Sequence, residues 1–542
     1  MHALIAMWAG LVALAGCVEP VQTDSGGTPA TVQLGEEVTC ANPVSRSEAA
    51  FDRALLPGEV VAVEPVGDVG QYDGGGVAVD DFDGDGFLDL FLPNTGTDQL
   101  FRGQAGGTFA NGDGNLPASA ADNDRTTGAS AADVDGDGDR DLFLADLGAG
   151  NEIWFNEGGT FRPVETGIEA TRWHAVGGSF GDLDQDGDLD LFVVNHYEGP
   201  ELETGLFTGE FPSSHPNELW RNEGDGTFSD VSEQLPPQLL GPAYTLASGW
   251  IDIDDDNVSE LYTVNDFGPY TVPNQMLAFA DGVGTALPAD LGLDVAIFGM
   301  GLGVGDVNGD AVPDFAMTSW DELVLLESGE GGWYNSALAR NFVPGADDHQ
   351  VAWGTVLADL DNDGDLDAPV SFGQLLMPDE MRERLDSIAL SNPEEQRDGL
   401  YIQQEDGTFS EQAAAWGVAD AGSERGVLAV DFDRDGWLDL VKRDALGPSA
   451  VYHARCGENR WIEVGFISPI VGGWVDVESG DRSWRRWIGA GSEGFASGGP
   501  PEAHFGVGGL ETVDVRVHWP GGGDSLFAGI PTNRRVVVSR GE

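Results

Sequence analysis

The chain has 542 residues, of which 94 are Asp or Glu and 25 are Lys or Arg, so its formal net charge is −69. A field of this sign repels nucleic acid and anionic membrane surfaces, and we expect neither as a partner. Hydrophobic residues make up 41% of the chain, which excludes wholesale disorder. The length exceeds that of an ordinary single-core domain unless repeats build the fold. The 79 glycines indicate many turns and favour an all-β fold.

Residues 1–17 have the composition of an export signal. Ala3 to Gly16 is an apolar run of about 14 residues, which is short for a membrane span. It ends in Leu14-Ala-Gly-Cys17, which resembles a bacterial lipobox. This resemblance implies a lipoprotein that is exported, lipid-anchored through Cys17 and located at the outer membrane or cell surface. Two alternatives stay open, an ordinary cleaved signal peptide and a cytosolic chain.

The segment 18–58 is expected to be a tether and N-terminal segment, because residues 18–38 are polar and show no periodicity. After processing, two cysteines remain, Cys40 and Cys456. In an exported protein two such cysteines favour one disulfide. The alternative is a pair of buried free thiols. A bridge would join the chain before the first repeat to the chain after the last.

A nine-residue acidic pattern occurs seven times between residues 59 and 456. We number these acidic loops one to seven in chain order; they start at Asp81, Asp133, Asp182, Asp252, Asp306, Asp359 and Asp431. A strand of small residues precedes each loop and an apolar strand follows it. A third strand comes next, and in several units a fourth begins at Gly-Thr-Phe, whose Phe we expect between neighbouring blades. Four short strands in about 50 residues make one propeller blade, so the pattern predicts a seven-bladed β-propeller.

The acidic loops carry carboxylates at positions 1, 3, 5 and 9, and six of the seven have Gly at position 4 or 6. In an extended loop, positions 1, 3 and 5 project to one side, and position 7 can add its backbone carbonyl. Such an oxygen cage suits Ca²⁺, so we expect up to seven ions. The predicted ligands are Asp81, Asp83, Asp85, Phe87 and Asp89; Asp133, Asp135, Asp137, Asp139 and Asp141; Asp182, Asp184, Asp186, Asp188 and Asp190; Asp252, Asp254, Asp256, Val258 and Glu260; Asp306, Asn308, Asp310, Val312 and Asp314; Asp359, Asp361, Asp363, Asp365 and Asp367; and Asp431, Asp433, Asp435, Trp437 and Asp439.

The loops are not equally complete, and the fourth and fifth are expected to bind calcium most weakly. The fifth has the amide Asn308 in place of a carboxylate and Ala311 in place of Gly. The fourth has Asn257 at the bend and the longer Glu260 at position 9. Because Asn tolerates positive φ, the fourth turn can still form.

Two long intervals between loops contain insertions. Residues 196–217 form a Pro- and Gly-rich loop with aromatic residues, and residues 376–398 suggest a short helix that ends near Asn392-Pro393. Insertions on a rigid scaffold often carry recognition, but they can equally be tolerated loops.

The C-terminal part, residues 457–542, lacks the acidic pattern and is expected to form a small β domain. The seven loops, from DFDGDGFLD to DFDRDGWLD, resemble the FG-GAP/VCBS repeats of integrin α-like propellers. Residues 489–522, with His504-Phe-Gly-Val-Gly508 and Val517-His-Trp-Pro-Gly521, resemble the ASPIC/UnbV domain of the cartilage acidic protein family. The sequence departs from that family at Ile467–Gly473, so no function of that segment is carried over.

No catalytic constellation stands out in the sequence, and no catalytic residue is predicted. His504 and His518 lie in expected strands, where a structural role is favoured over a catalytic one. We therefore expect a monomeric, non-enzymatic binding or adhesion module at the cell envelope, for a protein or polysaccharide partner. One alternative is an extracellular hydrolase or lyase that acts on polysaccharide or phosphoester, with the propeller as scaffold. A second is a purely structural component of the envelope.

Overall fold

The computed structural model describes residues 17–18, 30–44, 50–59, 75–117, 124–148, 150–170, 173–197, 205, 208–241, 243–280, 282–345, 350–375, 396–491 and 494–541. Within these ranges nearly all regular structure is β, and the α-helix is the single turn α3 (Ala413–Trp416). No helix in this part of the chain is long and apolar enough to span a membrane. The expected all-β fold is confirmed.

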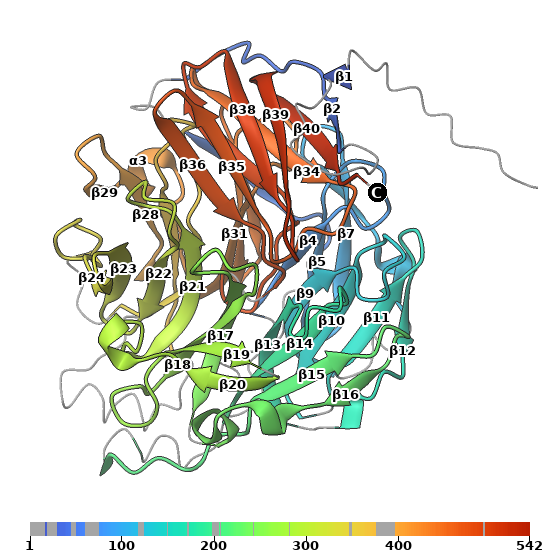
Figure 1. Ribbon diagram of the computed structural model, residues 1–542, viewed down its shortest axis with the longest axis vertical. Coiled ribbons are helices and arrows are strands. Elements are labelled where there is room, and N and C mark those ends of the chain that lie inside the picture. The colour runs from blue at the N-terminus through green and yellow to red at the C-terminus, as the bar shows by residue number, and fades with distance from the viewer. Residues whose placement is uncertain are drawn as a thin grey trace, which may run out of the picture.

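Seven antiparallel sheets follow one another along the chain, each starting with the strand that precedes an acidic loop. Their inner strands contact each other in sequence, so the sheets form a ring (Figure 1). The strands, sheet by sheet, are β4 (Ala78–Asp80), β5 (Asp89–Leu92), β7 (Gln99–Gln104) and β8 (Thr108–Asn111); β9 (Asp124–Ala132), β10 (Asp141–Asp146), β11 (Glu152–Asn156) and β12 (Phe161–Val164), with β6 (Thr95–Gly96) at the edge; β13 (His174–Gly181), β14 (Asp190–His196), β15 (Glu218–Asn222) and β16 (Phe228–Asp230); β17 (Tyr244–Ile251), β18 (Glu260–Asp266), β19 (Gln275–Ala280) and β20 (Val283–Ala286); β21 (Gly299–Gly305), β22 (Asp314–Ser319), β23 (Leu323–Gly329) and β24 (Gly332–Asn335); β25 (Ala352–Thr355), β26 (Ala368–Phe372), β28 (Gly399–Gln403) and β29 (Phe409–Glu411); and β31 (Glu424–Val430), β32 (Asp439–Asp444), β33 (Ala450–Ala454) and β3 (Phe51–Leu55).

The ring is closed by strands from both ends of the repeat region. β3 comes from the N-terminal segment and pairs with β33, so the last sheet is built from two distant parts of the chain. This sheet meets the first one where Gly426 N–H donates to the Gly75 carbonyl at 2.9 Å. β3 lies before residue 59, where the sequence placed the start of the propeller. Its pairing partner is about 400 residues away in sequence, which local periodicity does not reveal.

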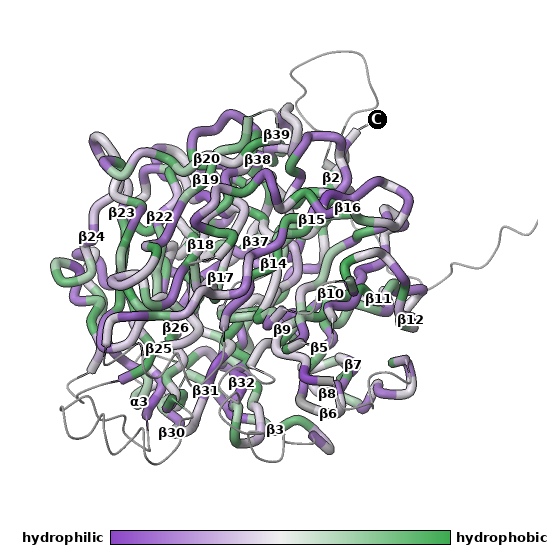
Figure 2. The backbone as a smooth tube through the Cα atoms, turned by 90° about the horizontal axis from the view of Figure 1, so that it is seen from below, coloured by the Kyte–Doolittle hydropathy of each residue, from purple (hydrophilic) through white to green (hydrophobic). Residues whose placement is uncertain are grey.

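The phenylalanines of the Gly-Thr-Phe signatures pack between sheets, as predicted. Phe161 lies edge-on to Phe82 of the preceding sheet, with ring centroids 5.3 Å apart. Phe109 contacts Phe432 across the closure of the ring at 5.1 Å. Figure 2 shows that many of the connecting loops are hydrophilic.

The C-terminal domain contains two sheets that enclose a core of their own. One holds β36 (Arg482–Trp487), β35 (Trp474–Ser479), β38 (Thr512–His518) and β39 (Asp524–Pro531). The other holds β1 (Cys17–Val18), β2 (Thr31–Leu34), β40 (Arg534–Ser539), β34 (Arg460–Phe466) and β37 (Ala503–Gly508). In the propeller part of the chain, β27 (Gln396–Arg397) and β30 (Ala421–Gly422) form a further two-stranded sheet.

The expectation of a flexible tether is wrong for Thr31–Leu34. β2 pairs antiparallel with β40, beside which it lies in Figure 1, and Val32 is buried in the core of the C-terminal domain. The buried Val32 lies between the exposed Thr31 and Gln33, an alternation too short to stand out among polar residues. The helix expected in 376–398 falls outside the described residues, except for β27 at its end.

A segment of the C-terminal domain, which we call the plug (residues 489–491 and 494–499), fills the centre of the ring. Its backbone binds inner strands of several sheets: Phe180 N–H donates to the Ala490 carbonyl at 2.9 Å and Val427 N–H to the Gly494 carbonyl at 3.0 Å. Phe495 is fully buried in a cluster that contains residues from four sheets, and its ring meets Trp353 edge-on at 5.2 Å. The C-terminal domain therefore supplies part of the propeller's own core.

The plug also explains the small residues of the inner strands. A side-chain carbon at Gly76 would lie 2.0 Å from the Ala496 carbonyl oxygen, and one at Gly354 would lie 2.4 Å from the Gly494 carbonyl oxygen. Both distances are far below van der Waals contact, so larger residues at Gly76 and Gly354 would displace the plug.

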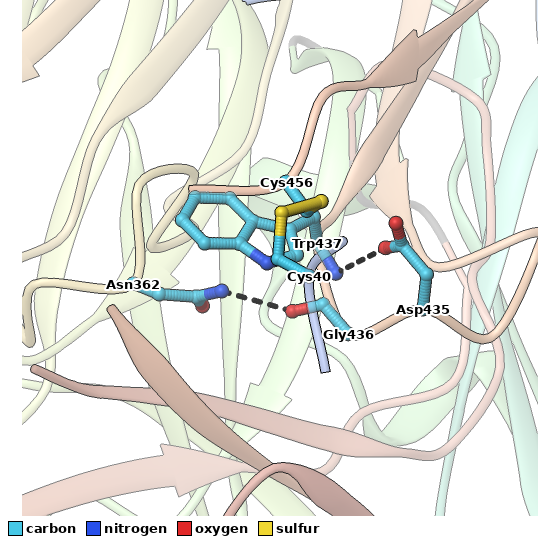
Figure 3. The surroundings of a disulfide bond; sticks show 6 residues. All are labelled: Cys40, Asn362, Asp435, Gly436, Trp437 and Cys456. Carbon is cyan, nitrogen blue, oxygen red and sulfur yellow. Dashed lines mark hydrogen bonds between the residues drawn. A yellow bond between two sulfur atoms is a disulfide. The ribbon is translucent and has the colours of Figure 1, made fainter. Parts of the chain in front are cut away.

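Cys40 and Cys456 form a disulfide, with Cα atoms 5.6 Å apart, beside Trp437 of the seventh loop (Figure 3). The bridge closes a loop of 416 residues next to the β3–β33 pair. Because a cross-link restricts the unfolded chain, we expect the double substitution Cys40→Ser, Cys456→Ser to lower the free energy of unfolding by about 3–5 kcal/mol. Guanidinium titration of both proteins measures this, and coincident midpoints would contradict a stabilising role.

Candidate metal centres

All seven acidic loops share one hydrogen-bond pattern. The N–H of position 7 donates to the carboxylate or equivalent oxygen of position 5 at 2.8–3.0 Å in every loop. The N–H of position 2 donates to the position 9 carboxylate at 2.7–3.3 Å, again in every loop. The nine-residue spacing thus folds each loop back onto the start of its second strand.

Each loop bends through two residues with positive φ, at positions 4 and 6. Gly occupies position 6 in five loops; in the other two, Asn257 and Ala311 adopt φ values of 67° and 65°. This conformation is free of strain for Gly, tolerated by Asn and unfavourable for Ala. The unfavourable φ of Ala311 is a backbone reason to expect weak calcium binding by the fifth loop, which stays a prediction.

Carboxylate oxygens converge in these loops. In the second, third, fourth and sixth loops the residues at positions 1, 3 and 9 place ligand atoms within 4.8 Å of one another, and in the first loop positions 1, 3 and 5 do so. Glu260 joins its group despite its longer side chain. The position 9 residue belongs to the group in those four loops and not in the first, and it also accepts backbone hydrogen bonds.

Burial makes these carboxylates unfavourable as isolated charges. Desolvation raises the pKa of Asp141 and of Asp190 to about 7, even though each accepts two backbone N–H bonds. In the sixth loop it raises the pKa of Asp359 and Asp367 well above the usual range, and the carboxylate of Asp361 adds to the rise. A divalent cation would stabilise the charged form of all of these groups.

The first and seventh loops differ from the others because a basic side chain contacts position 9. Arg102 Nη1 lies 2.5 Å from Asp89 Oδ2, and His453 Nδ1 lies 3.1 Å from Asp439 Oδ2. The Asp439 carboxylate in turn raises the pKa of His453. The nine-residue pattern predicts neither contact, because Arg102 and His453 lie outside it, on the third strands of their sheets.

Position 4 connects three of the loops to the C-terminal domain. Arg485 Nη1 donates to Asp255 of the fourth loop at 2.8 Å. His504 Nε2 lies 2.7 Å from Asn362 Oδ1 of the sixth loop. Arg434 of the seventh loop donates to two carboxylates of the C-terminal domain, Glu463 at 2.8 Å and Glu502 at 2.7 Å.

No role was predicted for position 4. The residue type at position 4 varies between loops, from Gly84 to Arg434, and this variation is the sequence feature that could have indicated contacts with another domain. Of the seven acidic loops, the sixth is the least exposed to solvent, with Asp359, Asp361 and Asp367 all buried.

The donor set fits a hard divalent cation. It consists of carboxylate oxygens brought together by short backbone-fixed turns, without a described His or Cys in any of the five named groups. When bound, calcium would supply charge compensation and cross-link the two ends of a loop. The protein itself fixes the carboxylate oxygens, because the N–H of position 2 donates to position 9 and the N–H of position 7 donates to position 5. The ligand residues themselves remain predictions.

The two histidines for which a structural role was favoured have structural contacts. His504 is buried against Asn362, and burial lowers its pKa to about 3. His518 lies 3.0 Å from Asp476 and stacks on Trp474 with ring centroids 4.6 Å apart.

Sequence-family models match the two parts of the chain separately. The model described as FG-GAP-like repeat matches residues 81–144, 133–193 and 383–441, which contain the first, second, third and seventh loops. The model described as ASPIC and UnbV matches residues 468–542. The chain is an FG-GAP-repeat β-propeller with a C-terminal UnbV domain. The UnbV domain therefore contributes the plug, and the FG-GAP repeats contribute the acidic loops.

Solved structures with a related chain course are distant in sequence, and no curated protein matches the FG-GAP/UnbV chain. A lectin of Agrocybe aegerita, described as recognising non-reducing terminal N-acetylglucosamine, is 15% identical with a TM-score of 0.38, covering 71% of this chain and 94% of its own. YCF48 bound to D1 peptide is 9% identical with a TM-score of 0.40, covering 80% and 99%. YCF48 from Cyanidioschyzon merolae is 9% identical with a TM-score of 0.41, covering 75% and 99%.

Proposed function

We propose that the protein is an exported, calcium-stabilised β-propeller that acts as a non-enzymatic binding module for a partner at the cell envelope. FG-GAP repeats and an UnbV domain support a binding or scaffold role. Calcium binding, export and the class of partner belong to the proposal.

The sixth loop is the observation that supports calcium most strongly. Asp359, Asp361 and Asp367 are at most 4% exposed, and their oxygens lie within 4.8 Å of one another. Three buried carboxylates at this separation repel each other strongly unless they bind protons or a cation. At neutral pH a bound divalent ion resolves this repulsion and keeps the loop in contact with the UnbV domain.

The proposed anchor is a lipid on Cys17, with the mature chain at the outer membrane or cell surface. The lipobox-like Leu14-Ala-Gly-Cys17 supports it. Growth of an expressing bacterium with labelled palmitate should label the wild-type protein and leave Cys17→Ala unlabelled. Equal labelling of both proteins, or of neither, would contradict lipidation at Cys17.

A binding assay and a turnover assay together test the main proposal against the enzymatic alternative. Immobilised protein should retain one or more components of a native envelope fraction in calcium, and release them in chelator. The same preparation should leave polysaccharide and phosphoester substrates unchanged. Reproducible turnover that a single substitution outside the acidic loops abolishes would establish the hydrolase or lyase instead.

A further inference from the structure

The face of the propeller opposite the acidic loops carries several aromatic rings that are exposed or half-buried. We call it the aromatic face and define it by Trp173, His174, His215, Tyr270, Phe298 and Trp320. Each acidic loop joins the end of an inner strand to the next strand, whereas His174 and Tyr244 are the first residues of inner strands. The UnbV domain binds the loop side through Asp255, Asn362 and Arg434.

The rings of the aromatic face form two groups that together span three sheets. At one end, His215 lies 5.0 Å from Trp173 and 4.6 Å from His174, measured between ring centroids. At the other end, Phe298 lies 6.2 Å from Tyr270 and 6.0 Å from Trp320. Phe211 joins the second group, with its ring centroid 5.4 Å from Tyr270 and 6.2 Å from the buried Tyr244, which lies 5.1 Å from the buried His196.

Each group has one large ring that is open to solvent. Trp173 is 40% exposed and Tyr270 is 52% exposed, and exposed large aromatic rings often mark a binding surface. The insertion 196–217 contributes Phe211 and His215, so it helps to build the surface.

Polar atoms without a described partner lie among these rings. The Trp320 Nε1 and His174 Nδ1 atoms are buried and have no hydrogen-bond partner within the described part of the chain, and the same holds for Ser214 Oγ. Buried polar atoms of this kind normally bind protein, water or ligand. Burial and the neighbouring His215 lower the pKa of His174 to about 4, so its imidazole is neutral at pH 7 and can donate or accept.

We propose that the aromatic face binds a neutral polysaccharide. A pyranose ring has a face of C–H groups, which stacks on exposed indole and phenol rings, and a rim of hydroxyls, which pairs with polar atoms between the rings. A chain of sugars also fits two groups of rings spread over three sheets better than a compact ligand does. The net charge of −69 opposes acidic polysaccharides, which leaves neutral ones. This inference rests on the proposed binding function and names its surface and ligand class.

Affinity electrophoresis of the full chain tests the site, with gels that contain a soluble cellulose derivative, a β-1,3-glucan, a galactomannan, an α-glucan or, for comparison, alginate. The variants are Trp173→Ala and Tyr270→Ala, whose exposed side chains can be removed without opening the core. Tyr334→Ala is the matched control, because Tyr334 is 54% exposed but lies on β24, the outer strand of its sheet.

The wild-type protein should be retarded in at least one neutral gel and not in alginate. Each of the two variants should raise the apparent dissociation constant by about tenfold or more, and the control should leave it unchanged. Equal binding by wild type and both variants would overturn the site, and absence of retardation in every neutral gel would overturn the ligand class. Capture of an envelope protein by the same variants would show that the binding function stands on another surface.

Discussion

Removal of calcium is expected to lower the melting temperature of the protein by about 10 °C or more. Each site filled at 100 times its dissociation constant contributes about 2.7 kcal/mol, and several sites add. In chelator the buried carboxylates of the sixth loop must bind protons or repel each other, so the loop and its contact with His504 should loosen together. Scanning calorimetry in calcium and then in excess chelator measures the shift.

Single-residue variants distinguish stabilisation by calcium bound in the acidic loops from general screening of the protein's net charge. Asp361→Asn removes one buried carboxylate of the sixth loop and should reduce the difference between the calcium and chelator melting temperatures. Glu330→Gln changes the net charge equally at an exposed turn and should leave that difference intact. Equal behaviour of the two variants would mean that calcium acts through general charge screening.

The pH dependence in chelator has a definite sign. Burial raises the pKa of Asp141, Asp190 and Asp314 to about 7, whereas unfolded Asp titrates near 4. The folded state therefore binds protons more tightly, so the free energy of unfolding in chelator falls as the pH rises from about 4 through about 7. The advantage of calcium over chelator should thus be larger at about pH 7.5 than at about pH 5.5.

The plug gives the second large effect. Phe495→Ala removes a fully buried ring at the centre of the propeller and should lower the free energy of unfolding by about 3–5 kcal/mol. Because the plug binds inner strands of several sheets, we expect the propeller and the UnbV domain to unfold in one cooperative transition. Calorimetry of the variant should show one shifted peak.

The matched control for the plug is Ile467→Ala, since Ile467 belongs to the same domain but is 65% exposed. It should leave the transition unchanged. Two separate transitions in the wild-type protein, with Phe495→Ala affecting one of them, would mean that the plug is not part of the propeller core.

The local parts of the fold could be predicted from the sequence. The acidic loops and the Gly-Thr-Phe signatures are short, repeat in register and are fixed by hydrogen bonds within nine residues, such as Phe82 N–H to Asp89. The blade-to-blade packing of Phe161 follows from the same repeat. The positive φ at position 6 could be predicted from the Gly found there in five loops, and the exception at Ala311 is also visible in the sequence.

Apart from the Cys40–Cys456 disulfide, which the sequence favoured and the structure confirms, the long-range parts could not be predicted. β2 and β3 are strands of four and five residues whose partners lie at the other end of the chain. Apart from Phe495, the described plug consists of Gly, Ala and Ser and has the composition of an ordinary loop, so its contacts with the inner strands and with Trp353 are not visible in the sequence. Arg102 and His453 compensate two of the loops from a neighbouring strand, which the nine-residue pattern does not contain.

Elemental analysis of the purified protein tests the central claim most directly. After gel filtration in metal-free buffer, the wild-type chain should retain several calcium ions per molecule, and Asp361→Asn should retain about one fewer. The sixth loop should be among those that retain calcium, because Asp359, Asp361 and Asp367 are all buried. Calcium at background level, together with a melting temperature that chelator does not change, would contradict a calcium-loaded propeller.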